Sequence, residues 1–523
     1  MNTADILTIA GSMVPDRVAV SDPDDTLSYM ELQSRVNKLA HALASIGVGK
    51  GANVGIMSVN SCNFVELYYA TAAVGATFVP LNFRAKTDEL QYMADASDVN
   101  VFFVSERYYP ILQEIRSQLP KVEHVYTVGF EADGEETIEQ LRETGEDVPF
   151  FTEVDDDDAA MVIYTSGTTA LPKGVVLTHK TLTAYVVNTQ NPVDPTTDPD
   201  VTMVAVPFFH VAGATTMLGS LWAGRKLAIL PQFDPSAWLD TVEREGVTHA
   251  FVVPTMLKRV MEADDFDNYD ISTLQLITYG AAPMPFEVVR QAIDVFDCGL
   301  MNAYGQTEST STMSYLGPDD HRLDGTAEEN ELKIKRLRSV GRPMPDIEIG
   351  ILKVDGSMQE PGEEGEICIR GDRIMREYQK REEETASAVV DGWLHTGDAG
   401  YLDPDNYLFI TGRLKDLIIR GGENISPGEV ESILEEHPSI EDVAVIGVPD
   451  IEWGEIVKAV VVGGDAEKPS DEDLTAFVKS RLASYKAPSQ YEWISEPLPR
   501  NHLGKLLKND IRDRWGAQTP SAS

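Results

Sequence analysis

Residues 159–174 read Ala-Ala-Met-Val-Ile-Tyr-Thr-Ser-Gly-Thr-Thr-Ala-Leu-Pro-Lys-Gly, and this stretch decides both the fold and the chemistry. It opens with an apolar run, which predicts a buried strand. The loop that follows carries hydroxyls, small residues and one cation, Lys173. Small residues let backbone N–H groups turn toward a ligand, so the pattern indicates a polyphosphate site at a strand end. An ordinary surface loop rich in Ser, Thr and Gly is the alternative.

This loop is not a Walker A motif. That motif is G-x-x-x-x-G-K-[ST], whereas here Pro172 precedes the lysine and Gly174 follows it. The loop instead resembles the phosphate-binding signature of the adenylate-forming superfamily, which includes acyl-CoA synthetases, firefly luciferase and stand-alone adenylation domains. Ala170 stands where that signature usually has Gly. Because Ala tolerates positive φ poorly, we expect a stiffer loop that keeps its phosphate-binding groups.

Composition narrows the functional class. The 523 residues include 43 basic and 85 acidic side chains, for a net charge of −42. Such a surface repels nucleic acid and anionic membranes. It is typical of proteins in concentrated salt, so we infer a halophilic host, with a merely acidic mesophilic protein as the alternative. ATP and CoA, the substrates that the resemblance implies, are anions. Basic residues in the binding site must therefore offset the negative potential of the surface locally.

No feature of the sequence indicates export or membrane insertion. The three cysteines, Cys62, Cys298 and Cys368, lack metal or disulfide spacing and are expected in the core of a protein in a reducing compartment. The N-terminus does not read as a secretory signal, and no apolar run approaches the ~20 residues that span a bilayer. We therefore expect a soluble cytoplasmic protein, a monomer or homodimer, with no nucleic-acid partner and no integral membrane segment.

The order of predicted elements indicates an α/β fold. Short apolar runs alternate with helical patterns through most of the chain, which is typical of layers built on largely parallel sheets. A β-rich stretch follows over Ile347–Ile369, and a compact α+β unit follows Gly412. We predict a large N-terminal domain of stacked α/β sheets with a β-rich subdomain over 1–412, a small C-terminal α+β domain over 413–515, and a disordered tail over 516–523.

Residues 304–308, Tyr-Gly-Gln-Thr-Glu, follow a strand-like run. A carboxylate beside a hydroxyl at a strand exit can hold Mg²⁺ against phosphate oxygens, and the preceding aromatic ring could stack on a base. A capped helix start is the alternative. In the family that the segment resembles, Tyr304 packs against adenine, Thr307 contacts phosphate and Glu308 binds magnesium.

Three further segments would hold the rest of the nucleotide. Gly280-Ala281-Ala282 follows a predicted strand, and such small residues allow a flat ring to lie against the backbone. Asp398 can accept two hydrogen bonds from a ribose diol, which Arg413 can reinforce at the sugar or α-phosphate. Turn residues are the alternative reading for each segment, but the segments that carry Asp398 and Arg413 resemble family signatures in the family order.

The resemblance assigns the ATP and AMP contacts residue by residue. They are Thr165, Ser166, Gly167, Thr168, Thr169, Lys173, Gly280, Ala281, Ala282, Tyr304, Gly305, Asp398 and Arg413.

Residues 421–427, Gly-Gly-Glu-Asn-Ile-Ser-Pro, lead into a predicted helix. Ser426 is expected to cap that helix and Pro427 to occupy its first position. The resemblance adds that Gly421 and Gly422 line the channel for the pantetheine arm of CoA.

The segment Pro499–Lys505 resembles the motif that bears the family's catalytic lysine. Lys505 would bridge the substrate carboxylate and the α-phosphate and stabilise the charge that develops there. An exposed surface lysine is the alternative. In the family the C-terminal domain is mobile and rotates about a hinge residue that matches Lys415. This rotation removes the residue that matches Lys505 from the site and brings in the glycine segment 421–422.

Residues 207–213, Pro-Phe-Phe-His-Val-Ala-Gly, indicate the specificity pocket. In acyl- and aryl-CoA ligases an aromatic–His pair borders the acyl pocket here, which assigns Phe209, His210 and Val211 to it. A core histidine is the alternative for His210. Amino-acid-activating relatives place an aspartate near this point to hold the ammonium, and its absence argues against amino acids.

The resemblance implies a ligase that uses Mg²⁺, ATP and CoA. It would convert a carboxylic acid to its acyl-CoA through acyl-AMP. The expected acid is a medium- or long-chain fatty acid. An aryl-CoA ligase, a stand-alone amino-acid adenylation enzyme, a luciferase-type oxidative enzyme and a non-catalytic nucleotide-binding regulator are the alternatives. An apolar pocket discriminates weakly between acids, because each buried methylene changes the binding free energy by only about 0.8 kcal/mol. The sequence therefore does not identify the acid.

Overall fold

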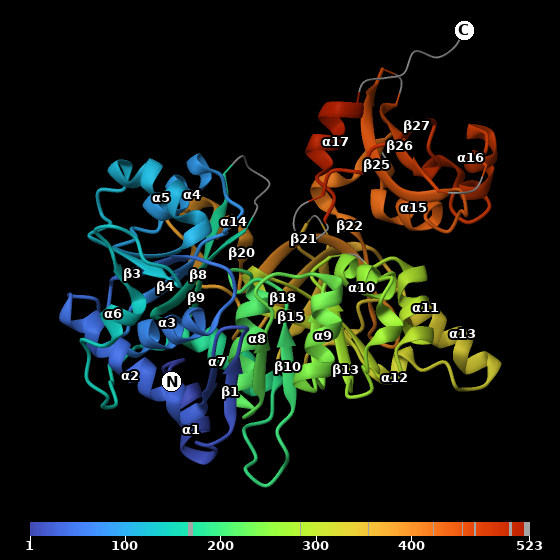
Figure 1. Cartoon of the computed structure of the whole chain (residues 1–523). Helices are drawn as coiled ribbons and strands as arrows, with labels where there is room; N and C mark the ends of the chain where they lie inside the picture. Colours follow the sequence, from blue (N-terminus) through green and yellow to red (C-terminus); the bar gives the residue numbers. More distant parts are fainter. Residues whose placement is uncertain are drawn as a thin grey trace.

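The computed structural model describes residues 1–165, 171–282, 284–353, 355–421, 423–451, 453–464, 467–500 and 505–516. Within these residues the chain forms one nine-stranded sheet, one eight-stranded sheet and two five-stranded sheets. Figure 1 shows the two large sheets together in the lower part of the molecule, with the C-terminal sheet and its helices above them.

The nine-stranded sheet is parallel through its centre. The strand order is β16-β15-β14-β13-β12-β10-β11-β1-β2, with parallel pairs from β14 to β1 and antiparallel pairs at both edges. Its strands are β1 (Val18–Ser21), β2 (Thr26–Ser28), β10 (Val201–Val204), β11 (Lys226–Ile229), β12 (His249–Val252), β13 (Leu276–Gly280), β14 (Gly299–Gln306), β15 (Ser311–Leu316) and β16 (Arg342–Pro343).

The eight-stranded sheet has the order β19-β9-β8-β4-β3-β5-β6-β7. It is parallel from β8 to β7 and antiparallel at β8–β9 and β9–β19. Its strands are β3 (Asn53–Met57), β4 (Thr77–Pro80), β5 (Val101–Ser105), β6 (His124–Val128), β7 (Glu136–Thr137), β8 (Ala159–Thr165), β9 (Lys173–Thr178) and β19 (Glu377–Tyr378).

The two smaller sheets come from the last third of the chain. The first contains β17 (Glu348–Leu352), β18 (Gly365–Arg370), β20 (Val389–Val390), β21 (Trp393–Leu402) and β22 (Leu408–Arg413). The second contains β23 (Ile418–Arg420), β24 (Glu423–Ile425), β25 (Ile440–Asp450), β26 (Gly454–Gly463) and β27 (Gln490–Ile494). Because these sheets separate between Arg413 and Ile418, we propose that the domain boundary lies in this segment, just beyond the boundary expected from the sequence.

Helices cover both large sheets and the C-terminal sheet. They are α1 (Asp5–Met13), α2 (Tyr29–Ser45), α3 (Cys62–Ala73), α4 (Thr87–Ala96), α5 (Tyr109–Ile115), α6 (Ile138–Arg142), α7 (His179–Thr189), α8 (Val211–Trp222), α9 (Pro235–Glu245), α10 (Pro254–Met261), α11 (Phe286–Val295), α12 (Pro318–His321), α13 (Ala327–Arg336), α14 (Glu382–Ala388), α15 (Pro427–Leu434), α16 (Asp471–Lys479) and α17 (Lys508–Trp515). In the described ranges, no helix combines the length and the apolar character that crossing a membrane requires.

Local signals fix the ends of several helices. At α2, Ser28 and Glu31 form a reciprocal capping box. At α9, Asp234 accepts from the backbone N–H of Ala237, Pro235 is the first helical residue, and Gly246 ends the helix with φ of 64°. These short-range contacts define where each helix starts and stops.

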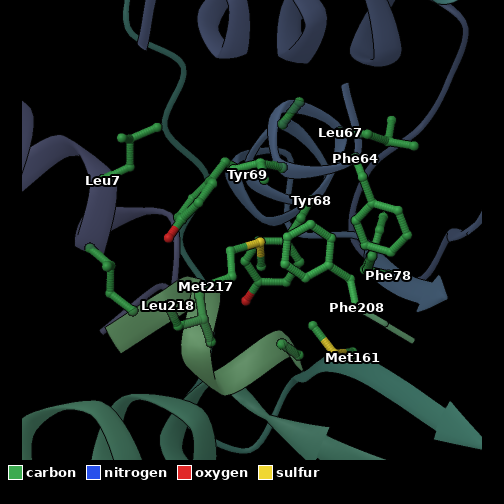
Figure 2. Packing of buried hydrophobic residues seen from close by; sticks show 14 of the residues in the cluster. Leu7, Phe64, Leu67, Tyr68, Tyr69, Phe78, Met161, Phe208, Met217 and Leu218 are labelled. Carbon is green, nitrogen blue, oxygen red and sulfur yellow. The ribbon is translucent and has the colours of Figure 1, made fainter. Parts of the chain in front are cut away.

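A continuous apolar core joins the sheets. Figure 2 shows side chains from α1, α3, β4, β8 and α8 converging on one cluster, in which Tyr68, Phe78 and Phe208 are buried. The rings of Phe64 and Phe208 lie 5.2 Å apart between centroids, and those of Tyr68 and Phe78 lie 5.4 Å apart. Because α3 and α8 share this core, the segment before α8 is held rigidly against the eight-stranded sheet.

The predicted fold class is confirmed: the chain is an α/β protein with largely parallel sheets and a smaller C-terminal α+β unit. Two local expectations were wrong. The strand expected to end at Ala303 continues to Gln306, so Tyr304 and Gly305 lie inside β14. Ser426 occupies the position before α15 but makes no capping hydrogen bond through its hydroxyl.

Candidate active site

The β8–β9 hairpin presents the predicted phosphate loop. Thr165 and Lys173 pair across the two strands at the point where the loop leaves the sheet. The predicted contacts Ser166, Gly167, Thr168 and Thr169 lie outside the described residues. The ammonium of Lys173 lies 4.8 Å from the ring centroid of Tyr378, on the neighbouring strand β19. The aromatic face therefore holds the loop cation at the sheet edge.

Tyr378 also connects this cation to the predicted magnesium ligand. Its hydroxyl donates a 2.8 Å hydrogen bond to Oε1 of Glu308. Burial, followed by the charge of Glu308, raises the pKa of Tyr378. The tyrosine therefore stays protonated and continues to donate to the carboxylate. Mg²⁺ sites commonly use one or two carboxylates together with substrate phosphates, and Glu308 beside the Thr307 hydroxyl fits that donor set.

The turn after Glu308 has an unusual backbone. Thr310 and Ser311 have φ of 50° and 76°, a conformation that is rare for residues other than glycine. The Oγ of Ser309 contacts the carbonyl oxygens of Gln306 and Ser311, at 2.9 Å and 2.8 Å. Such strain persists only where surrounding contacts fix it, and it commonly marks a functional site.

The segment before Tyr378 supplies those contacts. The fully buried Arg373 donates to the carbonyl of Thr312 and to Asp346, and its own carbonyl accepts from the Thr310 hydroxyl. The backbone N–H of Met375 donates to the carbonyl of Glu308 at 2.8 Å. Residues 373–378 therefore hold the strained turn through its backbone and hold Glu308 through its side chain.

Asp398 lies at the centre of the second cluster, in which β14, β21 and β22 meet. Its Oδ1 forms an ion pair with Nε of Arg413 at 2.6 Å. Its Oδ2 accepts from Tyr304 at 2.6 Å and from Nε2 of Gln306 at 2.8 Å. A carboxylate has about four lone-pair positions, so a ribose hydroxyl can take the remaining position or replace one of these donors. Tyr304 thus has a hydrogen-bonding role besides the stacking role expected from the sequence.

The small residues near this cluster have a packing role as well. A Cβ on Gly280 would lie 2.1 Å from the carbonyl oxygen of Ala303, and one on Gly305 would lie 1.8 Å from that of Ser311. Ala281 follows Gly280 with φ of 66° and an exposed side chain. The two glycines are therefore required by close backbone approach, while Ala281 and the adjacent Ala282 present small side chains at the strand exit.

Lys505 lies within electrostatic reach of the same cluster. Burial, followed by the charge of Arg413, lowers the pKa of Lys505 to about 8. Lys415 and Asp416 also act on it, and Asp416 pairs with Arg512 of α17 at 3.3 Å. Arg413 thus pairs with Asp398, and Asp398 also acts electrostatically on Lys505 and Lys415, so positive charge gathers near this carboxylate in a chain whose net charge is −42.

The expected hinge residue, Lys415, lies in the 3₁₀ turn Leu414–Asp416 between β22 and β23. Burial lowers the pKa of Lys415 as well. Gly421 follows with φ of 60°, and a Cβ there would lie 2.9 Å from the ring of Trp453. The second predicted channel residue, Gly422, lies outside the described residues.

The predicted acyl pocket residues lie at the start of α8. The rings of Phe209 and His210 are 4.3 Å apart between centroids, and Phe209 also packs edge-on against Phe83 at 5.0 Å. Phe209 is buried, whereas His210 and Val211 are half-buried. This arrangement places His210 and Val211 at the border of the aromatic core.

Sequence reasoning missed several residues of the site. Tyr378 stands in a two-residue strand with no flanking motif, and Arg373 lies in an irregular segment before it. Gln306 was part of a quoted motif but was given no role. Only the packing of β19 beside β9 brings Tyr378 to Glu308, so local sequence carries no signal for it.

Comparison with known proteins shows the family of this chain. The family model described as "AMP-binding enzyme" matches residues 8–379, and "AMP-binding enzyme C-terminal domain" matches residues 429–505. A fatty acid–[acyl-carrier-protein] ligase, ScoC of Streptomyces coeruleorubidus, is 32% identical over 508 residues, covering 96% of this chain and 94% of that protein. A feruloyl-CoA synthase of an Amycolatopsis species is 35% identical over 507 residues, covering 96% and 97%.

A solved structure has the same architecture. The amide bond synthetase McbA from Marinactinospora thermotolerans superposes with a TM-score of 0.87 at 28% identity, covering 98% of this chain and 100% of that chain. The names of the first two relatives give different acids and different acceptors, a fatty acid with acyl-carrier protein and a feruloyl group with CoA. The chain belongs to the AMP-binding enzyme family, in the group of AMP-forming acid ligases that includes the acyl-CoA synthetases.

Proposed function

We propose that this enzyme joins a carboxylic acid to CoA in two half-reactions. In the first, a carboxylate oxygen attacks the α-phosphorus of ATP, the bond to pyrophosphate breaks, and acyl-AMP forms. In the second, the CoA sulfur, after losing its proton to solvent, attacks the acyl carbon and AMP leaves. The observation that carries the proposal is the ion pair of Asp398 with Arg413, together with the effect that the charges of both residues have on Lys505.

In the first half-reaction the chain's own residues orient groups and neutralise charge. Asp398, held by Arg413, Tyr304 and Gln306, would fix the ribose. Lys505 would place its ammonium between the acid carboxylate and the α-phosphate, where negative charge develops. Glu308 and Thr307 would hold Mg²⁺, which supplies charge neutralisation at the phosphates when bound.

In the second half-reaction Gly421 and Gly422 would admit the pantetheine arm after a rotation about Lys415. The proposed acid is a medium- or long-chain fatty acid, with an aryl acid as the alternative, because Phe209, His210 and Val211 offer an apolar border without a carboxylate for an amino acid's ammonium. The relative that transfers fatty acids to acyl-carrier protein makes a carrier thiol the second candidate acceptor.

A panel of acids tests the proposal. Straight-chain fatty acids of increasing length, cinnamate-type acids and amino acids are assayed for AMP formation, with CoA or a phosphopantetheinylated carrier protein as the acceptor. We expect CoA-dependent AMP release that is highest with fatty acids. AMP release only with the carrier protein, or only with amino acids, would overturn the proposed substrate pair.

A further inference from the structure

A second group of chemistry-bearing side chains lies on the β18–β21 strand pair. Cys368 and His395 are direct cross-strand partners, and Glu366 is two residues before Cys368 on the same strand, across an irregularity in the register. Nδ1 of His395 lies 2.8 Å from Oε2 of Glu366 and 3.5 Å from Sγ of Cys368. The three donor atoms all lie within 4.8 Å of one another.

This arrangement is not that of a thiol nucleophile with its base. Such a site uses one imidazole nitrogen for the thiol and the other for the orienting carboxylate. Here both contacts fall on Nδ1, so the ring cannot relay a proton between them.

We propose instead that Glu366, Cys368 and His395 bind a transition-metal dication of the zinc type, at a position separate from the proposed magnesium site. Convergence of one nitrogen, one sulfur and one carboxylate oxygen on a common point is the geometry of chelation. This donor set favours zinc-like ions over Mg²⁺ and Ca²⁺, which prefer all-oxygen ligands.

Two of the three donor separations fit a tetrahedral centre after a small adjustment. Bonds of roughly 2.0 Å to nitrogen and 2.3 Å to sulfur put the two donors about 3.5 Å apart in tetrahedral geometry. The observed separation of Sγ from Nδ1 is 3.5 Å. The carboxylate oxygen must move away from Nδ1 by roughly half an ångström, because two zinc-bound N and O donors lie about 3.4 Å apart.

The surroundings support a three-ligand site with an open fourth position. The side chains of His395 and Glu366 are 27% and 21% exposed, so an ion and a water molecule can reach them. The second oxygen of Glu366, Oε1, accepts from the backbone N–H of Gly397 at 3.2 Å. This outer contact orients the carboxylate in the way that metal ligands usually require. It also connects the proposed site to Asp398, which follows Gly397.

Cobalt(II) is the probe for this site, because a cobalt–thiolate bond gives a charge-transfer absorption that oxygen and nitrogen ligands do not give. The full-length, metal-stripped protein is titrated with Co²⁺ in the absence of ATP, and Zn²⁺ is then added. We expect a thiolate band that saturates at equimolar Co²⁺ and disappears with Zn²⁺. The same titration should raise the midpoint of thermal unfolding, because the folded state binds the ion.

Variants assign the band to the three side chains. Cys368→Ser and His395→Gln should lose it, and Glu366→Gln should weaken it while keeping an oxygen that can accept from Gly397. Cys298→Ser is the matched control, since it removes a half-buried thiol elsewhere and should leave the band unchanged. No thiolate band in the wild-type protein, or a band that survives Cys368→Ser, would overturn the proposal even if a variant failed to fold.

Discussion

The hydroxyl of Tyr378 lies 2.8 Å from Oε1 of Glu308, while the ring of the same tyrosine lies 4.8 Å from the ammonium of Lys173. One side chain therefore connects Lys173 with Glu308, which are 135 residues apart in the sequence. Lys173 is proposed to bind phosphate and Glu308 is proposed to bind magnesium. We propose that Tyr378 orients both groups toward the same triphosphate.

Tyr378→Phe should impair the use of Mg-ATP. Loss of a hydrogen bond to a charged group costs about 1.5–3 kcal/mol, which corresponds to a decrease in kcat/KM for Mg-ATP of roughly tenfold to a hundredfold. The requirement for free Mg²⁺ should rise, whereas the KM for CoA should not change. Acid-dependent pyrophosphate exchange at several magnesium concentrations measures these values.

Tyr407→Phe is the matched control for that variant. Tyr407 donates to Oδ1 of Asp320 at the same 2.8 Å but belongs to another region. In a Glu308→Gln background, Tyr378→Phe should have little additional effect, because the two side chains act together. Equal magnesium profiles for Tyr378→Phe and Tyr407→Phe would exclude the positioning role.

Lys505 gives the first half-reaction a distinct pH dependence. Burial and the charge of Arg413 lower its pKa from the usual 10.5 to about 8. The ammonium is therefore present in the folded protein below pH 8 and is lost above it, so kcat/KM for ATP should fall by about tenfold per pH unit beyond that value. Lys505→Arg, if active, should keep its rate to higher pH.

Lys415→Arg serves as the control for the neighbouring lysine, whose pKa is also lowered. It should leave the decline near pH 8 in place. Stability changes in the opposite direction: between pH 8 and 10.5 the unfolded chain holds the Lys505 proton that the folded chain has lost. This group therefore contributes an increase in unfolding free energy as pH rises through that window. A decline in rate that persists unchanged in Lys505→Arg would assign the titration to another group.

The sequence predicted the sheets and strand-end motifs because apolar runs and small-residue loops are local patterns. It did not predict the contacts of Tyr378, Gln306 and Arg373, which depend on pairings such as β19 with β9. The expected cap at Ser426 failed for a similar reason, since a hydroxyl in the right position need not be oriented toward the helix. The roles of the predicted site residues came from the family resemblance of their motifs and stay predictions, whereas their hydrogen-bonding partners required the tertiary fold.

Gly421→Ala tests the proposed CoA channel. Its Cβ would lie 2.9 Å from the Trp453 ring, at a residue with φ of 60°. We expect slower thioester formation and accumulation of acyl-AMP, with pyrophosphate exchange retained. Gly454→Ala is the control: it imposes similar strain at φ of 77°, but its Cβ would meet only ordinary contact distances, the nearest being 3.6 Å. Equal effects of both variants on thioester formation would contradict a channel role.

The net charge of −42 should make stability depend on salt. Repulsion between surface carboxylates is screened as the Debye length falls from ~10 Å at 0.1 M to ~3 Å at 1 M salt. The unfolding midpoint should therefore rise with KCl, and an uncharged osmolyte at matched osmolality should produce a smaller rise. Greatest stability in dilute buffer would contradict the inferred adaptation to salt.

The most direct test of the proposed ligase mechanism is a single-turnover experiment with and without CoA. Wild-type enzyme is mixed with a radiolabelled acid from the panel and Mg-ATP, quenched, and assayed for acyl-AMP, and CoA is added to a parallel sample. We predict acyl-AMP stoichiometric with enzyme, converted to acyl-CoA on addition of CoA. Lys505→Ala should form no acyl-AMP but should convert supplied acyl-AMP to thioester. Thioester without an acyl-AMP precursor, or formation of ADP in place of AMP, would contradict the account.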